Sequence, residues 1–231
     1  MKIAILGYGK MGKAIESIAI ERGHEIVAKL DLKNKGNFKD ADMAINFCTP
    51  STAYKNIKEA LNNNIPVVSG TTGWLKDFKE IEKLAIQEKV GFLYSPNFSI
   101  GVNLFFQLNK SLAKLLKSHK YSVELYEKHH SNKADSPSGT SISLANDIIS
   151  NSNYKNWSLE EDSEKILKIK SIRQGDCTGI HNIIYNSKFD KISISHESNS
   201  RDGYAVGSVI AAEWLRGKIG VFSMLDVLKT K

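Results

Sequence analysis

The sequence predicts an α/β protein in which an N-terminal, doubly wound parallel sheet is followed by an α+β domain with a mixed or antiparallel sheet. Three observations lead to this prediction. Short apolar runs, typical of buried parallel strands, alternate with helical patterns over residues 1–100. A glycine-rich turn joins the first run to the first helix. After residue 120, apolar and polar residues alternate along several strands, which is typical of a sheet with one covered face.

Composition limits the classes of partner. The chain has 231 residues, 41% hydrophobic and 25% charged, which is enough for one large domain or two small ones. The net charge is +7, but the lysines are scattered and no nucleic-acid motif appears, so we predict no nucleic-acid partner and a mild preference for anionic ligands. No apolar run approaches the roughly 20 residues that span a bilayer, so we predict no membrane partner. Cys48 and Cys177 form no disulfide framework, and no signal-peptide pattern appears, which favours the cytoplasm.

The first strand, residues 1–6, runs directly into the turn Gly7-Tyr8-Gly9-Lys10-Met11-Gly12, and a helix is predicted over residues 13–22. This is a G-x-G-x-x-G pattern between a strand and a helix. Its glycines permit a tight turn, close approach of a pyrophosphate to the backbone, and close packing of helix on strand. The pattern therefore predicts a Rossmann-type domain that binds a dinucleotide.

Asp31 ends the second predicted strand, residues 25–30, about 20 residues beyond the glycines. An acid at this place binds a ribose hydroxyl in such folds and would repel a 2′-phosphate, which argues for NADH. Lys33 and Lys35 follow and could offset that repulsion. The sequence therefore leaves NADH, NADPH or the use of both open.

Small and polar residues follow three further strands, predicted over residues 44–47, 65–69 and 90–94. The segments 48–51, 70–73 and 95–99 lie where each strand ends. Ligands of open α/β sheets bind beyond the carboxyl ends of the strands, so these segments suit a nicotinamide pocket. Helices are predicted over residues 54–62 and 78–87, and a long helix over 104–116 leaves this half of the chain.

The strand predicted over residues 121–127 leads into four potential cations within six residues: Lys128, His129, His130 and Lys133. Ser138 is a suitable N-cap for a helix over residues 142–149. The start of a helix is an anion site, and imidazoles and an ammonium beside it suit a small anion that exchanges a proton. A solvated basic loop is the plain alternative. A metal site is not predicted, because adjacent histidines on a strand point to opposite faces.

The remaining strands are predicted over residues 166–173, 181–185 and 191–196, and the polar stretch 151–165 carries no recognisable chemistry. An amphipathic helix follows over residues 205–216, and we expect residues 221–228 to pack on the first domain. We therefore predict a dinucleotide-binding domain of residues 1–100, completed by 205–231, and a substrate-binding and oligomerisation domain of residues 101–204.

Residues 127–140 match the pattern E-x-H-H-x-x-K-x-D-x-P-S-G-T at every specified position. This pattern is the hallmark of the 4-hydroxy-tetrahydrodipicolinate reductase (dihydrodipicolinate reductase) family of lysine and diaminopimelate biosynthesis, which the chain resembles. The resemblance extends to the glycine turn, to Gly-Thr-Thr-Gly at residues 70–73 and to Asn-Phe-Ser-Ile-Gly-Val-Asn at 97–103. It thus covers nearly the whole chain.

The resemblance implies an enzyme that reduces a cyclic dicarboxylate, 4-hydroxy-tetrahydrodipicolinate, to tetrahydrodipicolinate with NADH or NADPH, and that assembles as a homotetramer. It implies that His129 gives and takes a proton and that Lys133 donates one. Spacing does not decide which of the two delivers the proton. The implied substrate contacts are His130, Ser138, Gly139, Thr140 and Thr72. The implied cofactor contacts are Gly7, Tyr8, Gly9, Lys10, Met11, Gly12, Asp31, Gly70, Thr71, Thr72, Ser95, Pro96, Asn97 and Phe98.

Two other functions were weighed. An aspartate-semialdehyde dehydrogenase would need a thiol nucleophile, and neither Cys48 nor Cys177 has an evident partner base in the sequence. A non-catalytic module that senses NAD(H) would need the glycine turn but not the His-His-Lys loop. The intact loop favours the reductase.

Overall fold

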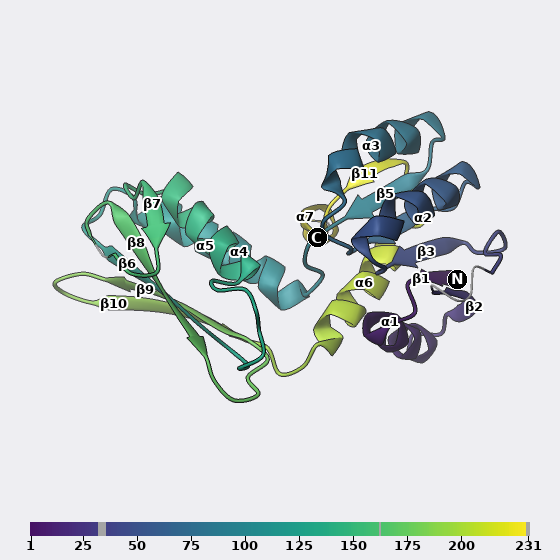
Figure 1. Ribbon diagram of the computed structural model, residues 1–231. Helices are drawn as coiled ribbons and strands as arrows, with labels where there is room; N and C mark the ends of the chain where they lie inside the picture. The colour runs from purple at the N-terminus through teal and green to yellow at the C-terminus, as the bar shows by residue number, and fades with distance from the viewer. Residues whose placement is uncertain (32–35, 162, 230–231) are drawn as a thin grey trace. The chain divides into compact units, whose positions relative to one another are not determined.

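The structure, a computed structural model, describes residues 1–31, 36–161 and 163–229 (Figure 1). It divides into two compact units, one of Met1–Ile100 with Asp202–Lys231 and one of Gly101–Arg201. Lys33 and Lys35, on which cofactor choice partly depended, lie outside the described residues. No helix in the described part of the chain is long and apolar enough to cross a membrane.

The first unit is built on a sheet in which all paired strands are parallel. Within the described residues the sheet has six strands in the order β11-β5-β4-β3-β1-β2. The strands are β1 (Lys2–Leu6), β2 (Glu25–Leu30), β3 (Met43–Asn46), β4 (Val67–Ser69), β5 (Gly91–Tyr94) and β11 (Gly220–Phe222). The strand order reverses between β1 and β3, so this sheet has the switch point typical of doubly wound folds.

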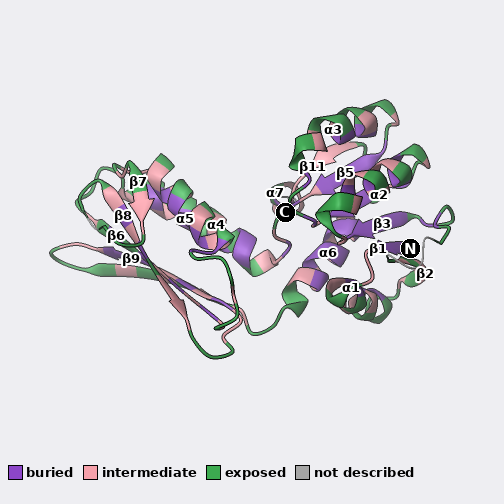
Figure 2. Cartoon of the chain, viewed as in Figure 1, coloured by how far each residue is buried: buried purple, intermediate pink, exposed green. Residues whose placement is uncertain are grey.

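Helices cover both faces of this sheet, and Figure 2 shows the buried strands between them. Ile3 and Ile5 of β1 pack with residues of α1 and α6, whereas Ala4 and Leu6 pack with residues of α2 and α3. Successive residues of a strand face opposite sides, so one apolar run supplies both layers. The helical segments of the unit are α1 (Lys10–Glu21), α2 (Pro50–Asn62), η1 (Leu75–Asp77), α3 (Phe78–Gln87), α6 (Asp202–Leu215) and α7 (Met224–Leu228). The predicted doubly wound parallel sheet is confirmed.

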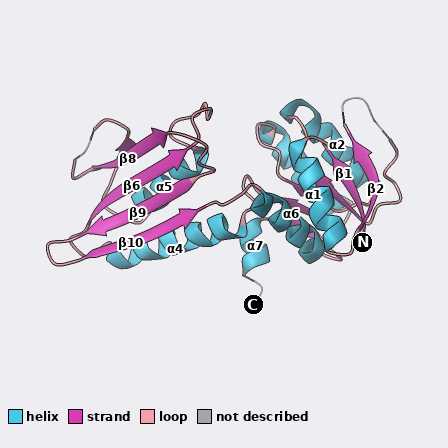
Figure 3. Cartoon of the chain, turned by 90° about the horizontal axis from the view of Figure 1, so that it is seen from below, coloured by secondary structure: helices cyan, strands magenta, loops and turns pink. Residues whose placement is uncertain are grey.

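The second unit holds a mixed sheet whose described strands follow the order β10-β9-β6-β8-β7. The strands are β6 (Ser122–His129), β7 (Asn156–Ser158), β8 (Ile166–Arg173), β9 (Ile180–Asn186) and β10 (Lys191–Glu197). β8 runs parallel to both β6 and β7, and the other pairs are antiparallel. Figure 3 shows α4 (Ile100–Leu116) and α5 (Gly139–Ser150) on the same face of this sheet. The prediction of a mixed sheet with one covered face is confirmed.

The boundaries differ from prediction in a systematic way. The structure places a strand, β7, in the stretch 151–165, where the sequence analysis assigned none. Several helices begin about one turn earlier than predicted: α1 begins at Lys10 and α5 at Gly139. The first turn of each of these helices is rich in small and polar residues, so apolar periodicity detects the helix only where its buried stripe begins.

Candidate active site

The glycine turn of the first unit is a backbone cradle at the start of α1. The N–H groups of Gly7 and Tyr8 both donate to the Leu30 carbonyl at 2.9 Å, which ties the turn to the end of β2. A Cβ on Gly7, whose φ is +107°, would lie 2.2 Å from the Phe47 carbonyl oxygen. Gly9 is the N-cap of α1, has no side-chain cap, and would direct a Cβ into open space. The turn therefore presents backbone N–H groups to an open region, which fits a pyrophosphate.

Three other residues of the predicted cofactor site surround this turn. Asp31 directly follows β2 and is exposed, as is Lys10. Tyr8 is half-buried: its hydroxyl donates to Glu16, and the ammonium of Lys29 lies 5.1 Å from the centre of its ring. The side chain of Tyr8 is thus held against α1, and its backbone N–H ties the turn to the end of β2.

The loops after β4 and β5 use several predicted cofactor side chains to hold their own shape. The Thr71 hydroxyl accepts hydrogen bonds from the backbone N–H of Cys48 at 3.0 Å and from Asn46 at 3.3 Å. The Ser95 hydroxyl donates to the Asn97 carbonyl at 2.7 Å. These loops can therefore offer mainly their backbone to a ligand.

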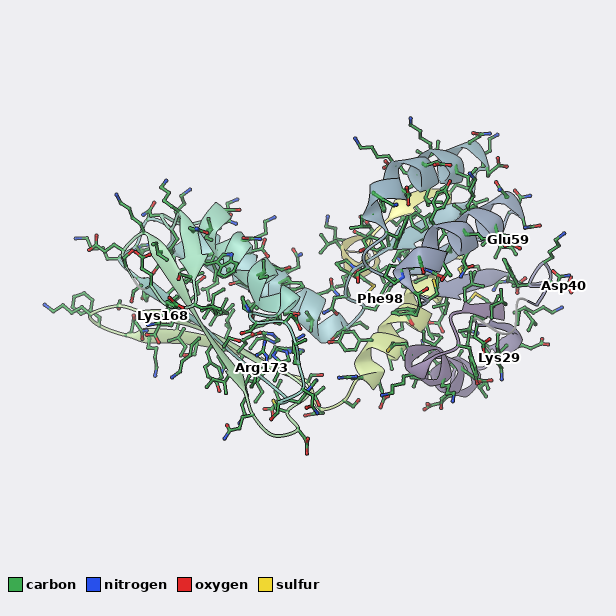
Figure 4. All side chains as sticks on the ribbon, viewed as in Figure 1. Lys29, Asp40, Glu59, Phe98, Lys168 and Arg173 are labelled. Carbon is green, nitrogen blue, oxygen red and sulfur yellow. The ribbon has the colours of Figure 1, made fainter. Side chains whose placement is uncertain are left out.

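Phe98, labelled in Figure 4, is only 1% exposed and packs on Phe47 with ring centroids 5.6 Å apart. Gly70 lies against the same Phe47 ring, since a Cβ there would be 2.3 Å away. Thr72 and Pro96 are exposed. Asn46, which the sequence analysis did not single out, is fully buried beneath these loops, and its Oδ1 has no hydrogen-bond partner among the described residues.

The second unit gathers its charged residues around Glu127, a fully buried residue of β6. One carboxylate oxygen accepts hydrogen bonds from the backbone N–H of Ser138 at 3.0 Å, from Ser171 at 2.6 Å and from Arg173 at 2.9 Å. The other oxygen accepts from Ser141 at 2.7 Å. Ser171 and Arg173 both come from β8, and Arg173 is labelled in Figure 4. One buried carboxylate thus joins β6, β8 and the start of α5.

Glu127 is a permanent negative charge. Burial by itself would raise the pKa of this carboxyl, but hydrogen bonds from His181, Ser138, Ser171 and Ser141 outweigh burial and hold the pKa well below its usual range. The guanidinium of Arg173 balances the charge. Neither Arg173 nor His181 was a predicted site residue, because each lies more than 40 positions along the chain from Glu127.

His129, the last residue of β6, is 7% exposed. Its Nδ1 faces Glu127 Oε2 at 3.5 Å. Burial lowers the pKa of His129 to about 4, and interactions with His181, Lys133 and Arg173 act in the same direction, against the opposing effect of Glu127. A free histidine titrates near neutral pH. In this structure the ring of His129 is uncharged there, because burial dominates.

Lys133 lies in the loop between β6 and α5, and its ammonium is 2.7 Å from the carboxylate of Asp135. The hydrogen bond from Lys133 lowers the pKa of Asp135. The structure thus gives Lys133 an anionic partner within its own loop.

Ser138 is the N-cap of α5, as predicted, and its hydroxyl accepts from the N–H of Ser141 at 3.2 Å. Gly139 and Thr140 form the first turn, and a Cβ on Gly139 would meet open space. On the other side of the loop, His130 helps to line a cavity of about 270 Å³. The Nε2 of His130 lies 3.3 Å from Arg201. The other residues that line this cavity are Asn132, Asp176 and Thr178.

Glu127, His129 and His181 offer ligand atoms within 4.8 Å of one another, close enough to hold a metal ion. Four donors already bind the Glu127 carboxylate, and one of them is the positively charged Arg173. A divalent cation would have to displace these hydrogen bonds and meet the guanidinium. The chemistry of the cluster suits a buried ion pair with two imidazoles better than a metal centre.

The depressed pKa of His129 predicts how stability varies with pH. Between pH 6.5 and about 4 the unfolded histidine binds a proton that the folded one does not, so stability falls as pH falls. The loss is about 1.4 kcal/mol per pH unit, or roughly 3 kcal/mol over this window. Urea unfolding of wild type and His129→Gln across this window measures it. The variant should lose less stability on acidification, and equal slopes would contradict the prediction.

Comparisons with known proteins assign both halves of the chain to the same family. The family model "Dihydrodipicolinate reductase, N-terminus" matches residues 1–98, and "Dihydrodipicolinate reductase, C-terminus" matches residues 101–228. A 4-hydroxy-tetrahydrodipicolinate reductase of Christiangramia forsetii is 47% identical, over 99% of this chain and 98% of its own. The reductase of the same name from Rickettsia rickettsii is 39% identical, over 96% of this chain and 95% of its own.

The fold agrees with a solved structure. The dipicolinate-bound dihydrodipicolinate reductase from Paenisporosarcina sp. TG-14 superimposes with a TM-score of 0.79 at 22% sequence identity, and the match covers 98% of each chain. The sequence relatives carry the assignment to a family of oxidoreductases in lysine and diaminopimelate biosynthesis. The chain therefore belongs to the dihydrodipicolinate reductase family.

Proposed function

We propose that the first unit binds NADH or NADPH at the glycine turn. The second unit binds a cyclic, unsaturated dicarboxylate at the loop between β6 and α5. The enzyme reduces this dicarboxylate to tetrahydrodipicolinate. When bound, the nicotinamide supplies a hydride to a ring carbon of the substrate. The loop must then hold the carboxylates and supply a proton to the neighbouring atom. One observation carries this proposal. The uncharged imidazole of His129, the ammonium of Lys133 and the start of α5 at Gly139 all lie in or beside this one loop.

We assign the proton to Lys133. Its ammonium has a carboxylate partner and a side chain that is 23% exposed, so it is both charged and accessible. His129 is uncharged near neutral pH and faces Glu127 through Nδ1, so its Nε2 is free to accept a hydrogen bond or a proton. Glu127 would stabilise the imidazolium that forms if His129 accepts one. In this proposal Lys133 donates the proton to the ring, and His129 takes a proton from solvent and passes it to Lys133, which restores the ammonium.

The substrate carboxylates have two classes of partner. The backbone N–H groups at the start of α5, at Gly139 and Thr140, suit one carboxylate. His130 and Arg201, 3.3 Å apart at the edge of the cavity, suit the other. The guanidinium of Arg201 supplies a positive charge and N–H donors to an anion at this place.

We propose that Gly9 is the glycine through which the pyrophosphate meets the backbone. Gly9→Ala is expected to change the free energy of unfolding by less than about 1 kcal/mol, because the new methyl group meets no neighbour. It should raise the NADH dissociation constant by about tenfold or more, because the methyl group occupies the space of the ligand. Calorimetric titration with NADH measures this. Gly203→Ala, in the first turn of α6, is the control, since its Cβ would also meet little. Equal NADH affinity in wild type and Gly9→Ala would contradict the proposal.

Asp31 favours NADH, and we propose that NADPH is also used, with lower efficiency. We further propose that the enzyme is a cytoplasmic homotetramer that assembles through the face of the second sheet opposite α4 and α5. That face carries half-buried apolar residues, among them Ile172, Ile180 and Ile184. Analytical ultracentrifugation tests the assembly state, and a monomer at all concentrations would refute this part of the proposal.

The reaction is tested by following oxidation of NADH and NADPH in the presence of substrate made in situ from pyruvate and aspartate semialdehyde by the preceding synthase. We expect absorbance loss that requires the synthase and both of its substrates, faster with NADH. A folded protein that binds NADH but oxidises neither cofactor would refute the proposed reaction.

A further inference from the structure

A row of polar side chains crosses the helix-covered face of the second sheet. The strand register pairs His196 of β10 with His181 of β9, and His181 with Glu127 of β6. On the far side, Glu127 pairs with Ser171 of β8. His129 is two residues beyond Glu127 on the same strand, so both face the same way. His196 of β10 and His181 of β9 are thus placed by two different strands in the row that contains Glu127 of the proposed site.

His181 contacts each part of this arrangement. It is 4% exposed, and its Nε2 lies 3.3 Å from the Ser138 hydroxyl and 3.6 Å from Glu127 Oε2. Its ring meets that of His129 edge to face, with centroids 5.0 Å apart and an interplanar angle of 71°. One buried imidazole therefore touches the cap of α5, the carboxylate and the ring of His129.

The polar row stabilises the sheet less than a row of apolar side chains would. The Nδ1 atoms of His129, His181 and His196 are buried without a hydrogen-bond partner among the described residues. Each unpaired buried polar group costs about 1–3 kcal/mol. The adjacent row of the same strands, on the same face, is entirely apolar and consists of Ile194, Ile183, Leu125 and Ile169. The polar row replaces such packing only at the end of the sheet that carries the proposed site.

We propose that His181 and Glu127 are positioning residues for His129. This proposal rests on the proposed role of His129. The carboxylate of Glu127 faces Nδ1 of His129 and selects the tautomer that has its proton on Nδ1. His181 packs against the ring of His129 and donates from its Nε2 toward Glu127 and Ser138. At 3.5 and 3.6 Å the two carboxylate contacts are longer than most hydrogen bonds, as catalytic contacts often are before substrate binds. Nε2 of His129, which faces Gly179, is then left as the acceptor.

The tautomers can be read directly in the wild-type protein. Nitrogen-15 chemical shifts of labelled histidines near neutral pH should place the proton of His129 on Nδ1 and one proton of His181 on Nε2. A proton on Nε2 of His129 would overturn the proposal. This measurement needs no turnover, so its failure and failure of the proposed reaction are distinguishable.

A double-mutant cycle tests whether His181 acts through His129. His181→Gln is expected to lower kcat by about 10- to 100-fold in the wild-type background, because a misplaced catalytic group is costly. In the His129→Gln background the same change should lower kcat by less than about twofold, because the residue that it positions is gone. Equal factors in both backgrounds, or no effect in either, would overturn the proposal. If His181→Gln fails to fold, the tautomers of the wild type still decide.

Tyr185→Phe is the matched control for this cycle. Tyr185 lies on the same strand and face as His181, is 2% exposed, and its hydroxyl has no partner among the described residues. Removing the Tyr185 hydroxyl perturbs the buried face of β9 but leaves the contacts of Glu127 unchanged. Its kcat should equal that of the wild type in both backgrounds, and a loss comparable to that of His181→Gln would assign the effect to packing and overturn the proposal.

Discussion

The His129→Gln variant is expected to turn over roughly 10²- to 10⁴-fold more slowly than the wild type, the usual contribution of a group that handles a proton. Glutamine retains a polar side chain of similar reach but cannot accept a proton. The apparent affinity for the substrate should change much less, because His130 and the start of α5 hold the carboxylates in the proposed mechanism. Steady-state kinetics with synthase-generated substrate separate kcat from KM.

His119→Gln is the control for this prediction, because His119 is exposed beyond the end of α4 and is not part of the proposed site. The unfolding transitions of both variants should be compared with wild type, so that a folding defect is not mistaken for a catalytic one. Wild-type turnover in a folded His129→Gln variant would remove this residue from the mechanism.

The Glu127→Gln variant is expected to lower the free energy of unfolding of the second unit by about 3–5 kcal/mol, the usual cost of breaking a buried ion pair. The amide keeps the size of the side chain but leaves Arg173 with an unbalanced buried charge. It also replaces an acceptor oxygen by an N–H₂ group among four hydrogen-bond donors. Urea unfolding, with hydrogen exchange of β6 and β8 to isolate the second unit, measures the loss.

Glu124→Gln is the matched control, since Glu124 is on the same strand but exposed, where it accepts a hydrogen bond from Asn186 at 3.0 Å. Its effect should stay within about 0.5 kcal/mol. Because the pKa of Glu127 lies below its unfolded value, its contribution is present above about pH 4.3 and is lost only as pH falls further. The difference between wild type and Glu127→Gln should therefore shrink in strong acid. Equal losses in the two glutamate variants would show that burial of Glu127 does not matter.

Much of the fold can be predicted from patterns of residues that are close together in the sequence. Apolar runs of the length of β1 can be buried on both sides only between two layers of helices, so the parallel sheet follows from alternation along the chain. The strand and helix on either side of Gly7 to Gly12 identify the cradle. Ser138 is identified as a cap because capping depends on residues three positions apart. These features depend on neighbours in sequence, so the sequence by itself determines them.

What surrounds Glu127 was decided by the tertiary structure. Ser171, Arg173 and His181 reach its carboxylate because β6 lies between β8 and β9, and strand order and register are set by packing over the entire sheet. The charge of His129 was decided in the same way. A free histidine titrates near neutral pH, but burial of His129 in the folded unit lowers its pKa to about 4. The sequence thus determined which chemical groups the site contains, and the fold alone decided their protonation, because solvation and charged neighbours exist only once distant strands have met.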